Sequence, residues 1–146
     1  MVSSNATEAT IDYFLKTIRI QNPNVIPHCI MSDKDRGQMN AIQWRYPESH
    51  LLLCWWHMLH AWQHFVTNHY PELWDLMRKW VQMTNKQDFN TGWEIIQTLA
   101  PPSLAEYLHV NWMNELELWS AVHWQDHTIY ELCDTNMLVE AYVIFD

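Results

Sequence analysis

The 146-residue sequence has few of the residues that make tight turns, because only two glycines, Gly37 and Gly92, are present. All-β folds with many hairpins depend on such turns, so this scarcity disfavours them and favours helices. No apolar run approaches the roughly 20 residues that a membrane-spanning helix needs, so we expect no membrane span. The N-terminus also lacks the basic-then-apolar pattern of a signal peptide, which predicts an intracellular protein.

Cysteines and basic residues are also few, and their positions are informative. Three widely spaced cysteines do not form the pattern of a disulfide framework, which favours a reducing compartment. All eight Lys and Arg residues lie within positions 1–86, whereas positions 87–146 carry ten Asp and Glu. DNA affinity comes largely from neutralising phosphates, so this chain is expected to bind DNA weakly or not at all by itself.

Apolar and aromatic residues are abundant, at 49% and 14% of the chain. The ten tryptophans could each bury about 150–250 Å², so much of the hydrophobic core is expected to be aromatic. This composition predicts one folded domain, or part of one.

The first half of the chain alternates helical and extended patterns. A first helix is predicted to end at Asn22-Pro23, with an apolar face of Ile11, Phe14, Leu15 and Ile18. A strand over about 25–31 and a helix that ends at Pro47 follow, the latter with Met39, Ile42 and Tyr46 at helical spacing. The continuous apolar run 50–56 is typical of a buried strand. This order predicts a parallel βαβ unit with a right-handed crossover.

Residues that can carry chemistry follow both predicted strands: Asp33 and Asp35 after the first, Cys54 and His57 after the second. In parallel sheets, ligands bind beyond the carboxyl ends of the strands. We therefore expect these four residues at one edge of the sheet.

The second half is predicted to be helical. Pro71 begins a helix whose core positions are Leu73, Met77, Trp80 and Val81. The next helix has Phe89, Trp93, Ile96 and Leu99 at core spacing. A capping box of Ser103 and Glu106 is expected to begin a third, and Asp134 or Thr135 to cap a last one.

Three histidines, His57, His60 and His64, fall on one side of a helix if the segment is helical. Cys54 precedes them, so these four residues form an alternative set of zinc ligands. A single Cys-His pair lacks the second pair of a zinc finger, and the histidines also suit a half-exposed amphipathic helix.

Asp33, Asp35 and Glu140 form the other candidate set. Carboxylates are suitable ligands for Mg²⁺, and two such ions can activate water and stabilise a leaving oxygen in phosphodiester cleavage. Many α/β proteins have an Asp after a strand, so these residues by themselves leave the function open.

Four motifs in order resemble the Mutator-like element (MULE) transposase domain. They are Ser32-Asp33, "NAI" at positions 40–42, Tyr46-Pro47, and Cys54 with His57 in "CWWH". The later "TNMLVE", from Thr135 to Glu140, resembles another segment of that family, and the opening "SSNATEATIDYFL" resembles its first helix. The resemblance covers nearly the whole chain.

The resemblance implies a partial ribonuclease H-like α/β fold: a βαβ core with a large all-helical insertion over about 58–131. It also implies an Asp-Asp-Glu nuclease and strand transferase that uses Mg²⁺ or Mn²⁺, with Asp33 and Glu140 as catalytic metal ligands. Asp35 is the alternative acid, and Cys54 and His57 form the family's Cys-x2-His motif. The implied partner is transposon-end DNA, and the implied location is the nucleus.

The sequence departs from the family at both ends. Residues 1–146 contain neither the family's first Asp nor its first three strands, and the sequence ends six residues after Glu140. We therefore expect a fragment of the catalytic domain that is inactive alone. The alternatives are a repurposed protein-interaction module, with self-association, and a small Cys/His zinc-binding domain.

Overall fold

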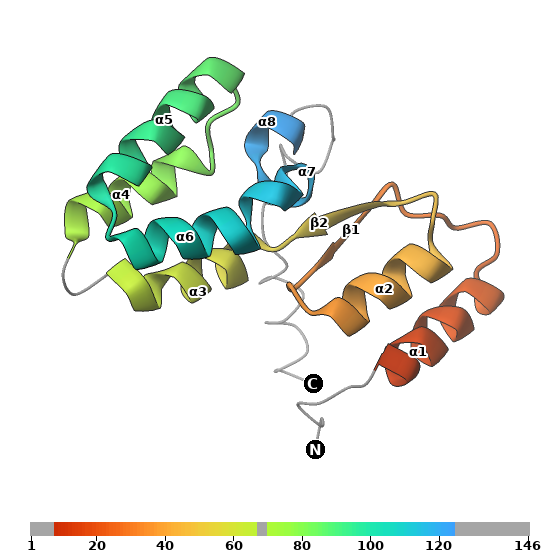
Figure 1. Cartoon of the computed structure of the whole chain (residues 1–146). Coiled ribbons are helices and arrows are strands. Elements are labelled where there is room, and N and C mark those ends of the chain that lie inside the picture. Colours follow the sequence, from red (N-terminus) through yellow and green to blue (C-terminus); the bar gives the residue numbers. More distant parts are fainter. Residues whose placement is uncertain (1–7, 67–69, 125–146) are drawn as a thin grey trace, which may run out of the picture. The chain divides into compact units, whose positions relative to one another are not determined.

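The computed structural model describes residues 8–66 and 70–124, and the chain divides into two compact units, with the division along the sequence between Cys54 and Trp55 (Figure 1). The first unit contains α1 (Glu8–Gln21), β1 (Cys29–Ser32), α2 (Arg36–Arg45) and β2 (His50–Leu53). The second contains α3 (Trp55–Val66), α4 (Pro71–Trp80), α5 (Lys86–Leu99), α6 (Pro102–Asn111), the 3₁₀ turn η1 (Met113–Glu115), α7 (Leu116–Trp119) and α8 (Ala121–Trp124). The described chain is thus mostly helical, with one two-stranded sheet. None of its helices is both long and apolar enough to cross a bilayer.

β1 and β2 are parallel, and α2 connects them, which confirms the predicted βαβ unit. The register pairs Cys29 with His50 and continues to Ser32 with Leu53. Parallel neighbours need such a crossover because the chain must return to the same end of the sheet. All three leucines of β2 are buried, as expected for a strand covered on both faces.

The predicted strand boundaries are partly wrong. β1 begins only at Cys29, and the β-branched residues Val25 and Ile26 are exposed in the segment that precedes it. β2 ends at Leu53, and the two tryptophans that extend its apolar run begin α3 instead. An apolar run by itself does not distinguish a strand from the first turn of a buried helix.

α2 has the apolar face that the sequence predicts. Met39, Ile42 and Tyr46 are all buried, and the helix ends before Pro47. Asp35 caps its N-terminus, because the side chain accepts a hydrogen bond from the backbone N–H of Gln38 at 2.8 Å. This bond satisfies one of the amides that the first helical turn leaves without a partner.

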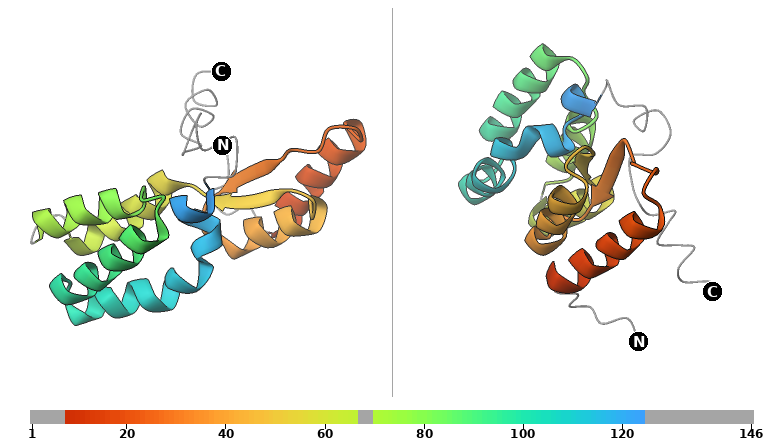
Figure 2. Two further views of the ribbon diagram at one scale, coloured as in Figure 1. Left: turned by 90° about the horizontal axis from the view of Figure 1, so that it is seen from above. Right: turned by 90° about the vertical axis from the view of Figure 1, so that its right-hand side faces the viewer.

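α1 packs beside α2, as the two further views also show (Figure 2). Two ion pairs hold it there. Arg45 donates from Nε and Nη2 to the Asp12 carboxylate at 2.5 and 2.6 Å. Arg19 donates to both carboxylate oxygens of Glu48 at 2.6 and 3.0 Å. Such two-pronged contacts fix orientation because the guanidinium and the carboxylate are both planar.

The apolar face predicted for α1 is only partly correct. Ile11, Leu15 and Ile18 are half-buried, but Phe14 is 62% exposed. The helix has no fully buried residue, since charged side chains share its contact with α2. Apolar periodicity alone does not reveal an interface in which ion pairs contribute.

Tryptophans fill the core of the second unit. The largest fully buried side chains are Trp62, Trp80, Trp119 and Trp124. Several indole N–H groups of this unit donate to backbone carbonyls: Trp80 to Phe89, Trp119 to Trp112, and Trp55 to Trp119. These bonds offset the cost of burying the polar indole nitrogen.

The predicted core positions of α4 are confirmed, since all four are buried. Two predictions for the next helices are wrong. Leu99 is 56% exposed, and Gly92 is buried on the contact face of α5 instead. The capping box is absent, because α6 begins at Pro102 with Pro101 as its N-cap and no side-chain cap bond. Pro102 suits the first helical position, because the N–H group that it lacks would have no partner within the helix there.

Candidate functional site

Asp33 lies directly beyond the carboxyl end of β1, where the sequence places it. The preceding residue, Ser32, is buried, and its carbonyl accepts a hydrogen bond from the backbone N–H of Cys54 at 2.9 Å. The Ser32 hydroxyl lies 3.1 Å from Oε1 of Gln38 on α2 and 2.9 Å from the carbonyl of Asp33. The backbone that carries Asp33 is therefore fixed to both β2 and α2. The Asp33 side chain is half-buried.

Asp35 is two residues further on, and its side chain has a structural role. Its Oδ1 caps α2, so the carboxylate is directed at the first turn of that helix. The sequence left Asp35 as an alternative catalytic acid; the cap bond explains an aspartate at this position without any catalytic role.

Glu140, the third acid that the resemblance implies, lies outside the described residues, as do Thr135 and Asn136. The predicted approach of Asp33 and Glu140 therefore stays a prediction. So does the last helix expected after Asp134.

Cys54 and His57 fall on either side of the boundary between the two units. Cys54 directly follows β2 and is buried, with 1% of its surface exposed. His57 lies in the first turn of α3 and is half-buried. Their pairing as a Cys-x2-His motif stays a prediction.

His60 and His64 are on α3, and both are exposed. Within residues 8–66 and 70–124, no three His, Cys, Asp or Glu side chains converge as metal ligands. The described residues thus do not bring Cys54, His57, His60 and His64 together as one cluster, and zinc binding by this four-ligand set stays a prediction.

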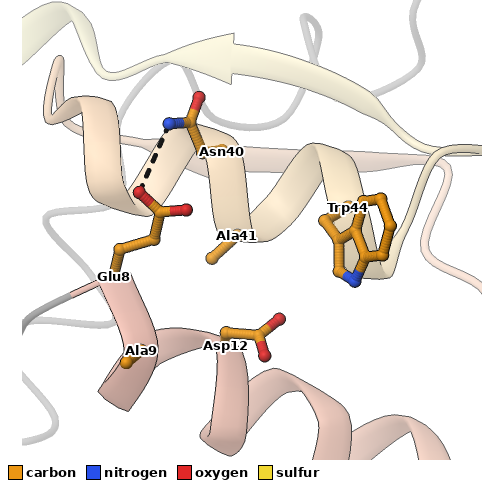
Figure 3. A pocket seen from close by; sticks show the side chains of 6 residues that line it. All are labelled: Glu8, Ala9, Asp12, Asn40, Ala41 and Trp44. Atoms are coloured by element: carbon orange, nitrogen blue, oxygen red, sulfur yellow. Dashed lines mark hydrogen bonds between the residues drawn. The ribbon is translucent and has the colours of Figure 1, made fainter.

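A groove of about 430 Å³ lies between α1 and α2 (Figure 3). Its lining residues are Glu8, Ala9, Asp12, Asn40, Ala41 and Trp44. Asn40 donates a long hydrogen bond of 3.4 Å to Glu8, and Trp44 is 75% exposed. Neither Asp33 nor Asp35 lines this groove, so it is separate from the predicted catalytic edge.

This groove was not among the features predicted from the sequence. A signal was present in Trp44, which occupies a position off the apolar face that Met39 and Ile42 define. A tryptophan on the polar side of an amphipathic helix indicates an exposed aromatic surface.

Asp12, which lines the groove, and Glu48 each accept hydrogen bonds from an arginine. The hydrogen bonds from Arg19 lower the pKa of Glu48 to about 2. The hydrogen bonds from Arg45 likewise lower the pKa of Asp12. Arg19 also lies over the ring of Tyr46, 5.1 Å from its centroid, and donates to the carbonyl of Arg45. These contacts fasten α1 to the end of α2, and the lowered pKa values keep both carboxylates ionised at neutral pH.

Comparison with known proteins gives one family. No curated protein and no solved structure matches the chain. The family match covers residues 1–61, which include α1, the whole βαβ unit, Asp33, and both residues of the Cys-x2-His motif. Over these residues the chain matches the MULE transposase domain family.

Proposed function

We propose that this chain contributes the second and third acids of an Asp-Asp-Glu active site to a DNA transposase with a ribonuclease H-like fold. The observation that carries the proposal is the position of Asp33. It lies at the carboxyl end of a parallel strand, in a βαβ unit inside the segment that matches the transposase family. Carboxyl ends of parallel strands are where α/β folds place their ligands.

Asp33 is suited to hold a divalent cation. Mg²⁺ and Mn²⁺ prefer carboxylate oxygens. The Asp33 carboxylate is half-buried, and the hydrogen bonds of the preceding residue, Ser32, fix the local backbone to β2 and α2. Asp33 and Glu140 would hold the metal. When bound, two such ions activate an attacking oxygen and stabilise a leaving oxygen. In this proposal, Asp33 supplies one carboxylate to the metal from a fixed position at the edge of the sheet.

Asp35 has a structural role in this proposal. Its cap bond to Gln38 keeps the first turn of α2 formed directly after the Asp33 loop. We therefore assign Asp35 to positioning α2, and through it the backbone beside Asp33, and assign metal binding to Asp33.

The substrate of the whole enzyme would be transposon-end DNA in the nucleus. The net charge of −9 opposes DNA binding by residues 1–146 alone. Metal ions bound by acidic residues, or basic surfaces elsewhere in the transposase, would have to supply the positive charge.

The test measures Mn²⁺ binding by the purified chain, from the loss of the free-ion paramagnetic resonance signal. Asp33→Asn and Glu140→Gln should each weaken binding by about tenfold or more, since removing a ligand costs at least as much as removing an outer-shell partner. Asp35→Asn is the matched control, because asparagine also caps helices well. Unchanged binding in Asp33→Asn, or an equal loss in Asp35→Asn, would contradict the assignment of Asp33.

One observation favours a second function, protein interaction. α1 presents three large exposed apolar side chains, Tyr13, Phe14 and Ile20, at 71%, 62% and 67% exposure. Exposed apolar clusters of this kind mark contact surfaces. If α1 mediates self-association, sedimentation velocity should show concentration-dependent dimers that the triple substitution of these residues by Ser abolishes. A monomer at all concentrations would rule out self-association.

A further inference from the structure

His60 and His64 lie one turn apart on the exposed side of α3. Their ring centroids are 5.8 Å apart. Residues at i and i+4 are neighbours on a helix surface, so an imidazole nitrogen of each ring can bind one ion between them. Two histidines at this spacing are also the ligand pair of helical zinc motifs, because both imidazoles project from one face.

The two imidazoles are available for coordination. Within the described ranges, no hydrogen bond is made by His60 or His64, and both side chains are open to solvent. α3 carries no Lys or Arg that would repel a cation. Trp56 stacks on His60 at a centroid distance of 5.1 Å and an interplanar angle of 4°. This stack restricts the orientation of the His60 ring, so less side-chain entropy is lost when a ligand binds.

We propose that His60 and His64 form a two-imidazole chelating site for a divalent transition-metal ion of the Zn²⁺ class. Neutral imidazole suits Zn²⁺, Ni²⁺ and Cu²⁺, whereas Mg²⁺ prefers oxygen ligands, so the site is chemically distinct from the carboxylate site proposed around Asp33. Water completes the coordination, because the pair supplies only two ligands. The site needs neither Cys54 nor His57, and it does not depend on the proposed function.

A bound ion would join two successive turns of α3. Because the ion binds the folded helix in preference to the unfolded chain, it should stabilise the second unit by mass action. Zn²⁺ is therefore expected to raise the Tm of the chain, and to do so only while both histidines are present.

The experiment is a calorimetric titration of the full, reduced chain with Zn²⁺, together with melting curves with and without Zn²⁺. His60→Asn and His64→Asn should each lower the affinity of this site by about tenfold or more and abolish the rise in Tm. His109→Asn is the matched control, because His109 is exposed near the end of α6 and has no histidine one turn away; both properties should be unchanged.

Absorbance with Co²⁺ in place of Zn²⁺ distinguishes the two-imidazole site from the four-ligand set. Ligation by His60 and His64 gives d–d bands that either His→Asn substitution removes, without a thiolate charge-transfer band. A thiolate band that disappears in Cys54→Ser, together with loss of Zn²⁺ affinity in that variant, would overturn the proposal in favour of the set that includes Cys54 and His57. Unchanged Zn²⁺ affinity in both His60→Asn and His64→Asn would also overturn it.

Discussion

Gly92 on α5 lies so close to Trp80 on α4 that no β-carbon fits between them. A β-carbon built at Gly92 would be 2.7 Å from Cδ1 of the Trp80 ring. Trp80 is fully buried, and its indole N–H donates to the carbonyl of Phe89 at 2.9 Å. The ring is held by this bond and its neighbours, so it has little room to move away.

Gly92→Ala should therefore destabilise the chain, although alanine is the better helix former. Overpacking a core costs about 1–3 kcal/mol, and the gain in helix propensity is about 1 kcal/mol. Urea unfolding should show a net loss of up to about 2 kcal/mol. Thr91→Ala, at the exposed neighbouring position, is the control and should be neutral or slightly stabilising. A stabilised Gly92→Ala variant would show that the Trp80 ring can move to admit a β-carbon at position 92.

Asp35→Ala should destabilise the first unit by about 0.5–2 kcal/mol, because it removes the N-cap of α2. Asp35→Asn should lower the free energy of unfolding by only about 0.3 kcal/mol, since asparagine caps helices as well as aspartate does. Chemical denaturation of both variants checks this pair. If the two substitutions cost the same, the charge of Asp35 matters and the cap bond does not.

The ion pair between Arg19 and Glu48 should make stability depend on pH in the acid range. The pKa of Glu48 is about 2 in the folded chain against 4.5 ordinarily, because Arg19 donates to its carboxylate. Its contribution is therefore complete above about pH 4.5 and is lost as the pH falls toward 2.

The measurement is the difference in unfolding free energy between the natural chain and Glu48→Gln, taken at several pH values. That difference should shrink as the pH falls through this range. It should also shrink in high salt, because the pair is exposed and ions screen it. A difference that stays constant with pH would mean that the pair does not form in solution.

Residues 1–146, tested alone, should not cut transposon-end DNA with Mg²⁺ or Mn²⁺. Two-metal catalysis needs several carboxylates converging on the ions, and the resemblance provides only Asp33 and Glu140 within this sequence. Gel assays of cleavage and strand transfer check this. Metal-dependent cleavage that Asp33→Asn and Glu140→Gln both abolish would show that another acid, with Asp35 the first candidate, completes the site.

The order and type of the elements in the first unit could largely be predicted from the local sequence pattern. The spacing of Met39, Ile42 and Tyr46 predicted α2, and the order of elements predicted the parallel pairing of β1 and β2. These features depend on period and connectivity, which are properties of the sequence itself. The same reasoning placed Asp33 after β1, and motif resemblance identified the family that residues 1–61 match.

Tertiary structure decided what local pattern could not. It placed Phe14 and Leu99 at the surface and Gly92 in the core, and it made Asp35 a helix cap. It also joined Asp12 to Arg45 and Arg19 to Glu48, pairs separated by 33 and 29 residues. Burial and long-range ion pairs depend on which surfaces meet after the chain has folded. Periodicity reports which residues share a face of a helix, but only the neighbouring element determines which face is covered.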